Sequence, residues 1–144
     1  MHKGATLSLQ SLDAHTLQAI KRTNITMDDF AGWMHRYRES GISTYTELIL
    51  GLPGETYESF TAGINTLLKA GQHEHINCYL LQLLPNSEMA ESAYIAQHGI
   101  KTRRMPQLLQ HSTPGADGIT EYHDIVVETA TMPPHMIGDS IPMN

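Results

Sequence analysis

The sequence predicts an α/β fold, in the form of a partial (β/α) barrel whose parallel strands alternate with helices. Runs of apolar and β-branched residues alternate with segments of helical spacing, which is typical of parallel βα units. The chain of 144 residues holds only a few such units, whereas a closed parallel barrel needs about eight. We therefore expect an incomplete barrel with exposed sheet edges.

The first predicted strand covers Ala5–Gln10, and two helical segments follow it. Asp13 is a candidate N-cap for the first helix, and Thr26 with the acidic residues after it resembles a capping box for the second. Gly41 supplies the stop for that helix. This part of the sequence therefore predicts one βα unit.

A second strand is predicted over Tyr45–Gly51, where the apolar run is continuous enough for burial on both faces. Thr56 is a candidate N-cap for the next helix, which closes at Gly71. Four side chains of this helix are expected to face inward: Phe60, Ile64, Leu67 and Leu68.

The second half of the chain is less regular. A third strand is predicted over Ile76–Leu84, stopped by the proline after it, and a helix over Met89–Gln97. Residues 101–120 contain several prolines and glycines, which predict a loop with one short helix around Pro106–Gln110. A last strand is expected at Ile125–Thr129, followed by a weakly patterned tail.

Composition restricts the classes of function. The net charge of -6 argues against nucleic acid as a main partner. No apolar run approaches the roughly 18 residues of a membrane helix, so we expect a cytoplasmic protein without a membrane partner. The single cysteine, Cys78, can close neither an internal disulfide nor a cysteine metal site. The nine histidines and eight methionines are expected to be surface polar residues and core filler.

The segment from Glu47 to Thr56 is the strongest local signal for a binding site. An acidic residue opens the buried strand, and Gly51, Pro53 and Gly54 form a turn at its carboxyl end. Ligands of parallel α/β folds bind at that end of the strands, and glycine lets the backbone approach them closely. A plain strand-to-helix turn explains the same composition and is favoured on composition alone.

Polar residues also stand at the exit of the first strand. Beyond Ser8, Gln10 can donate and accept hydrogen bonds, which suits a carboxylate, a ribose hydroxyl or an adenine edge, although a satisfied strand-end residue is the alternative. Arg22 follows at the end of the next helix, where a cation also interacts favourably with the helix dipole. The metal-like patterns His73–His75 and Met132–Met136 are interpreted as a solvated loop and a loose tail.

Taken together, these motifs resemble a known family. The segments Lys3–Ser11, Ile20–Ile25 and Glu47–Thr56 are similar, in order and spacing, to the second half of radical S-adenosylmethionine (SAM) barrels. The resemblance is strongest to large proteins that carry a cobalamin-binding domain ahead of that barrel. Leu80–Met89 and Val127–Met132 resemble later segments of the same proteins, so the similarity covers most of the chain.

The resemblance implies SAM as a ligand. In related radical SAM enzymes, a glutamine that closes the fourth barrel strand, an arginine after the next helix and an acidic residue that opens the fifth strand contact SAM. Gln10, Arg22 and Glu47 occupy the matching places here. Arg22 could pair with the SAM carboxylate, and Glu47 could accept hydrogen bonds from the ribose. Further candidates near the adenosine are Ser8, Gly51, Pro53 and Gly54.

One feature departs from the family pattern. Radical SAM enzymes hold a [4Fe–4S] cluster through a CxxxCxxC motif, which this sequence lacks. We expect residues 1–100 to form the C-terminal βα units of a radical SAM barrel, 101–136 a barrel-closing extension and 137–144 a disordered tail. The partner would be the missing N-terminal half of the barrel, in the same chain or a separate one. The cluster, and cobalamin where it is used, would bind outside this chain beside a small-molecule substrate. The chain alone is expected to be an inactive fragment.

Two other functions stay open at this point. A non-catalytic half-barrel could serve as an interaction module through its exposed sheet edge. An unrelated α/β barrel enzyme could bind a phosphate or sugar ligand at the turn between Gly51 and Gly54.

Overall fold

The computed structural model describes residues 4–107 and 121–138. Three strands form a parallel sheet in the order β1-β2-β3: β1 (Ala5–Gln10), β2 (Thr44–Leu50) and β3 (His75–Leu80). Three helices lie on its connections: α1 (Ala14–Ala19), α2 (Met27–Glu39) and α3 (Tyr57–Lys69). The expected alternation of parallel strands and helices is confirmed for this half of the chain.

The three helices begin at the caps that the sequence indicates. The side chain of Asp13 accepts a hydrogen bond from the first turn of α1, and Thr26 does the same for α2. Thr56 and Ser59 form a reciprocal capping box at the start of α3. Each cap satisfies N–H groups that the first turn of a helix otherwise leaves without partners.

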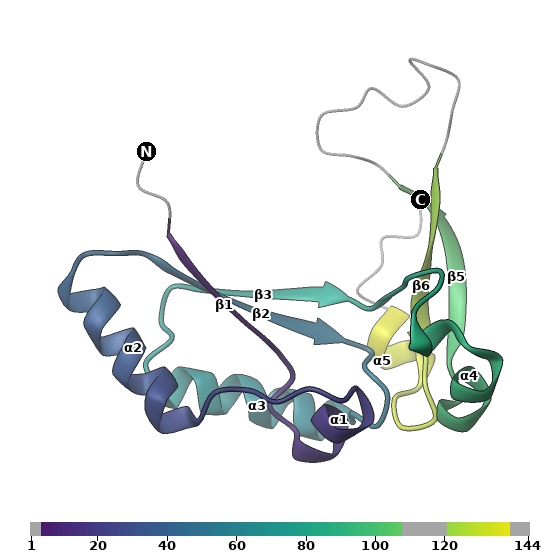
Figure 1. Cartoon of the computed structure of the whole chain (residues 1–144), viewed down its shortest axis with the longest axis horizontal. Helices are drawn as coiled ribbons and strands as arrows, with labels where there is room; N and C mark the ends of the chain where they lie inside the picture. The colour runs from purple at the N-terminus through teal and green to yellow at the C-terminus, as the bar shows by residue number, and fades with distance from the viewer. Residues whose placement is uncertain (1–3, 108–120, 139–144) are drawn as a thin grey trace.

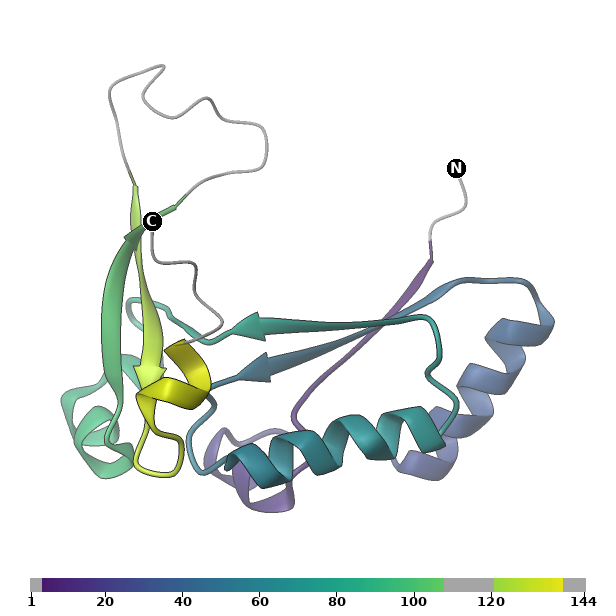
Figure 2. The same cartoon turned by 180° about the vertical axis from the view of Figure 1, so that it is seen from behind.

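All three helices lie on one side of the parallel sheet (Figures 1 and 2). Leu9 and Leu48 of the strands pack there against Phe30 and Met34 of α2 and Leu67 of α3. None of the helices that the structure describes is long and apolar enough to cross a membrane.

Two expectations about burial are wrong. Residues Tyr45, Glu47 and Ile49 of β2 are only half-buried, so this strand is buried on one face rather than both. Leu68 of α3 is 43% exposed, because it follows Leu67 by one position and one position is about 100° around a helix.

The predicted strand from Ile76 to Leu84 is in fact two strands in different sheets. β3 ends at Leu80, and the Leu81 N–H donates to the Leu50 carbonyl at 2.9 Å. The Leu81 carbonyl then accepts from Val126 N–H at 2.9 Å, so this residue joins the two sheets. The following β4 (Gln82–Leu83) already belongs to the second sheet.

The second sheet is antiparallel, with the strand order β4-β6-β5. It stands across the carboxyl ends of the parallel strands (Figure 1). Its other strands are β5 (Lys101–Pro106) and β6 (Tyr122–Glu128). Two helical segments connect β4 to β5: η1 (Glu88–Ala90) and α4 (Ser92–His98).

Two predictions near the C-terminus are also wrong. Pro106 ends strand β5 instead of starting a short helix; residues 108–110 of that prediction lie outside the described part. The tail after the last strand includes helix α5 (Pro134–Gly138), with Ile137 fully buried in the core. Proline suits the first position of a helix, because the N–H that it lacks has no helical partner there. Residues 139–144 of the expected tail lie outside the described part.

Two adjacent leucines of α3 provide a test of this packing. Leu67→Ala removes a fully buried side chain and should lower the free energy of unfolding by about 2–5 kcal/mol. Leu68→Ala is the matched control and should change it by less than about 1 kcal/mol. Urea unfolding followed by circular dichroism measures both, and equal losses would contradict the described helix orientation.

Candidate functional site

A row of polar side chains crosses the face of the parallel sheet opposite the helices. The register pairs Ser8 with Glu47, and Glu47 with Asn77. Because paired residues of neighbouring strands point to the same face, these three stand side by side. The Ser8 hydroxyl donates to Glu47 Oε2 at 2.5 Å. The structure therefore brings two of the predicted site residues into direct contact.

Aromatic and apolar side chains border this row on both sides along the strands. Toward the start of the strands, the Tyr45 and His75 rings are stacked, with centroids 5.0 Å apart and planes 8° from parallel. Toward the strand ends, Ile49 pairs in register with Tyr79, whose side chain is 52% exposed. The open face thus offers hydrogen-bonding groups between surfaces on which a planar ligand can stack.

Arg22 reaches the same row from the segment after α1. Its Nη2 donates to the Ser8 backbone carbonyl at 2.6 Å, and its Nε donates to Asn24 Oδ1 at 3.3 Å. A guanidinium has five N–H donors, so Nη1 keeps both of its own with no acceptor among the described residues. A cation and the Glu47 carboxylate therefore both contact Ser8, one through its main chain and the other through its side chain.

Gln10 lies where β1 leaves the sheet, in an uncommon backbone conformation. Its φ is 64°, and the pairing with β2 shifts register between Ser8 and Gln10. Non-glycine residues seldom adopt such angles, and bulges of this kind re-aim side chains next to functional sites. Gln10 lines a cavity of about 500 Å³ at the strand ends together with Lys21, Ile49 and Glu88. Lys21 and Glu88 also form an ion pair.

The predicted turn after β2 lies in a different environment. Gly51 and Pro53 are buried, and a side chain at Gly51 would lie 3.5–3.8 Å from atoms of the second sheet, its junction with β3, and α5. Neither of them, nor Gly54, is among the residues that line the cavity at the strand ends. As ligand contacts, these three residues stay untested predictions. Gly51 packs at the junction of the sheets, and Gly54 packs against His15 and Ala19 of α1.

Glu55, next to this turn, is a buried carboxyl group. It is 1% exposed, accepts a hydrogen bond from Ser11 Oγ at 2.5 Å on Oε1, and has no partner for Oε2 among the described residues. Burial raises the pKa of Glu55 to about 7, because leaving water penalises the charged form; the neighbouring Asp13 acts in the same direction. A carboxyl group whose charged form is disfavoured thus joins the exit of β1 to the turn after β2.

The metal-like sequence patterns have structural roles. His75 stacks on Tyr45, and His73 Nε2 lies 3.0 Å from the Leu68 carbonyl oxygen. Met132 is fully buried in the core, so the expectation that it lies in a loose tail is wrong. Within residues 4–107 and 121–138, no three histidine, cysteine or acidic side chains are grouped as a metal site would require. With Cys78 as its one cysteine, the chain does not fit an iron–sulfur cluster, whereas its open face does fit hydroxyl and carboxylate groups.

Sequence reasoning missed Asn77, Asn24 and the burial of Glu55. The alternation of polar and apolar residues along His75–Leu80 is a signal that could have placed Asn77 on the open face. Nothing in the local pattern distinguishes Asn24 or Glu55 from ordinary surface polar residues.

The fold and this site define one class: a parallel βα portion of a barrel whose inward face carries the polar row. Comparison with known proteins points to a particular family. The chain is 44% identical over 131 residues to the cobalamin-dependent radical SAM methyltransferase TokK of Streptomyces tokunonensis. It is 44% identical over 130 residues to the 2-(S-pantetheinyl)-carbapenam-3-carboxylate methyltransferase of Streptantibioticus cattleyicolor. Each similarity covers 90% of this chain, and the resemblance to radical SAM proteins is confirmed.

The chain spans about a fifth of the length of these relatives, since the match covers 19% of each. No protein-family model matches the sequence. Among solved structures, coproporphyrinogen III oxidase (HemN) of Escherichia coli, a radical SAM enzyme, overlaps 51% of this chain and 17% of its own, with 22% identity and a TM-score of 0.45.

The buried Glu55 predicts a pH dependence of stability. Its pKa in the folded chain, about 7, exceeds the ordinary 4.5. Its stabilising contribution is therefore fully present below about pH 4.5 and is lost as the pH rises through about 7. Between pH 5 and pH 8, the free energy of unfolding should fall by about 2 kcal/mol less for Glu55→Gln than for the native chain, because glutamine does not ionise.

Urea unfolding of both proteins at several pH values measures this difference. Glu58→Gln on the exposed face of α3 is the control and should follow the native pH profile. Identical slopes for the native chain and Glu55→Gln would show that Glu55 is not held in its neutral form.

Proposed function

We propose that this chain is the SAM-holding portion of a radical SAM methyltransferase barrel. The observation that carries the proposal is the contact set around Ser8: its hydroxyl binds Glu47 on the open face of the parallel sheet, and its main-chain carbonyl accepts from Arg22 at the edge of β1. The similarity of nine-tenths of the chain to radical SAM methyltransferases supports the same assignment. Methyl transfer and cobalamin use by the whole enzyme are part of this proposal.

Glu47, Arg22 and Gln10 are each assigned one part of SAM. Glu47 Oε2 accepts the hydrogen bond from Ser8, which leaves Oε1 to accept a hydrogen bond from a ribose hydroxyl. Arg22 keeps Nη1 for the methionyl carboxylate, and an Arg–carboxylate pair is a strong, directional contact. Gln10, at the edge of the cavity of about 500 Å³, can hydrogen-bond to the remaining polar edge of the ligand.

The iron–sulfur cluster has no ligand set in this chain, so its cysteines would come from the rest of the barrel. When bound, the cluster supplies the electron that cleaves SAM. We infer that the chain alone binds SAM without turning it over, and that the small-molecule substrate meets SAM only in the complete enzyme.

The missing part of the barrel is the proposed partner. β1 pairs with β2 along one side only, so the main-chain groups of its outer edge, other than the Ser8 carbonyl that binds Arg22, are available to a further parallel strand. This feature also supports the alternative of an interaction module, which differs by having no affinity for SAM. The alternative of a phosphate or sugar site at Gly51–Gly54 loses support, because Gly51 and Pro53 are buried.

Calorimetric titration of SAM into the purified chain tests the proposal. Glu47→Gln should weaken SAM affinity by about tenfold or more, because it removes the charge from an acceptor of ribose hydroxyls. Ser8→Ala should weaken it by a smaller factor, and Glu58→Gln should leave it unchanged. The proposed function would be contradicted if Glu47→Gln and Ser8→Ala bound SAM with the affinity of the native chain. It would also be contradicted if the native chain did not bind SAM.

A further inference from the structure

The segment that carries Arg22 has no regular structure of its own. Residues 22–26 connect α1 to α2 outside any helix or strand. An arginine side chain on such a segment has many accessible rotamers, and ordering it when a ligand binds lowers affinity. Some contact within the protein must therefore fix the guanidinium if it is to be preorganised.

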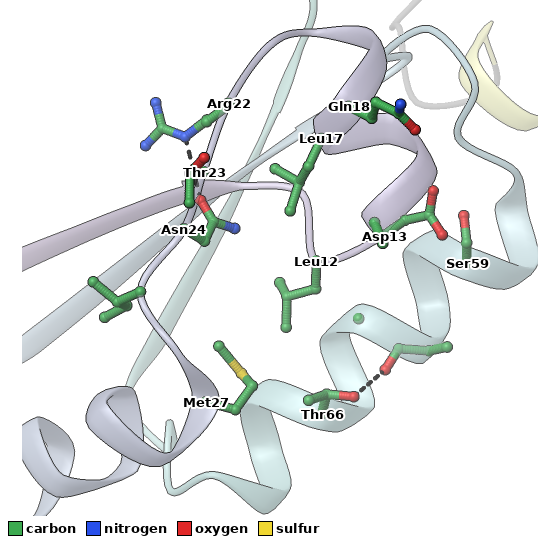
Figure 3. A pocket seen from close by; sticks show the side chains of 14 residues that line it. Leu12, Asp13, Leu17, Gln18, Arg22, Thr23, Asn24, Met27, Ser59 and Thr66 are labelled. Atoms are coloured by element: carbon green, nitrogen blue, oxygen red, sulfur yellow. Dashed lines mark hydrogen bonds between the residues drawn. The ribbon is translucent and has the colours of Figure 1, made fainter.

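Packing does not supply this contact. Arg22 and Asn24 both line a cavity of about 600 Å³ that is bordered by the side chains of Leu12, Leu17 and Met27 (Figure 3). Side chains beside an open volume of this size have room to change rotamer, so the orientation of Arg22 depends on its hydrogen bonds.

The Asn24 amide bridges Arg22 to the exit of β1. Its Oδ1 accepts from Arg22 Nε at 3.3 Å, the contact drawn in Figure 3, and its Nδ2 donates to the Ser11 carbonyl at 2.7 Å. An amide can accept from a guanidinium through its oxygen and at the same time donate to a carbonyl through its nitrogen. The two partners also fix which end of the amide is oxygen.

The far end of this bridge is a fixed point in the core. Ser11 is 1% exposed, and its hydroxyl donates to the buried Glu55 and accepts from Asp13 N–H at 3.1 Å. A chain of hydrogen bonds therefore runs from Glu55 through Ser11, Asn24 and Arg22 to the Ser8 carbonyl.

We propose that Asn24 is a positioning residue that holds the Arg22 guanidinium against the carbonyl of Ser8, ready for the carboxylate of SAM. The inference rests on the proposed SAM site, but its first step, the ordering of Arg22, is a property of the unliganded chain. Asn24 acts through Arg22 and does not itself contact the ligand.

NMR relaxation of the Arg22 Nε–H group in the unliganded chain tests the first step. Asn24→Ala should lower the order parameter of this group markedly, whereas Thr23→Ala, an exposed neighbour beside the same cavity, should leave it unchanged. Asn24→Asp keeps the acceptor for Arg22 Nε but loses the donor to Ser11, so its order parameter should be intermediate. This variant can be measured if Asn24→Ala does not fold. An Arg22 Nε–H equally ordered in the native, Ala and Asp proteins would overturn the proposal.

A double-mutant cycle on SAM affinity tests the second step. Asn24→Ala should weaken SAM binding by about three- to tenfold in the native background and have no further effect in the Arg22→Ala background. Equal effects in both backgrounds would overturn the proposal, because a general structural role gives additive losses. If the native chain does not bind SAM, the proposed function fails while the NMR measurement still decides whether Asn24 orders Arg22.

Discussion

The register between β1 and β2 is the constraint on which the site depends. Side chains alternate between the two faces of a strand, so burial of Leu9 and Leu48 beneath the helices directs Ser8 and Glu47 to the opposite face. A slip of one residue would exchange these faces and expose the leucines. The hydrophobic core therefore determines the geometry of the polar row, although none of its members belongs to that row.

The buried side and the open side of the sheet are connected by the loops at the strand ends. Leu81 hydrogen-bonds to both sheets, and Gly51 packs where the second sheet and α5 meet β2. Glu55 and Ser11 then tie the turn after β2 to the exit of β1. Through Asn24 this buried pair also supports Arg22, so the same loops that close the core orient the charged group at its edge.

Much of this arrangement could be predicted from sequence, because local chemistry determines it. Asp13, Thr26 and Thr56 cap helices for reasons confined to a few neighbouring residues. The order of the motifs predicted the resemblance to radical SAM proteins that the relatives confirm. Strand β5 could not be predicted, because most of its side chains are exposed and show no alternation. The break at Leu81 depends on partners far along the chain, and the roles of Glu55 and Asn24 depend on contacts that no local pattern encodes. The seven predicted site residues fall into three groups. Ser8 and Glu47 meet on the open face, and Arg22 contacts the Ser8 carbonyl. Gln10 lies at the cavity at the strand ends, and Gly51, Pro53 and Gly54 belong to the turn after β2.

The central claim is that the open face of the parallel sheet holds SAM. The most direct measurement is a titration of SAM into the isotopically labelled chain, followed by amide and arginine side-chain NMR shifts. The claim predicts saturable shifts concentrated at Ser8 to Gln10, Glu47 and the Arg22 guanidinium, with little change at Gly51 to Gly54. Shifts centred on that turn or on Leu12, Leu17 and Ser59, with Ser8 and Glu47 unchanged, or no saturable shifts at all, would contradict it.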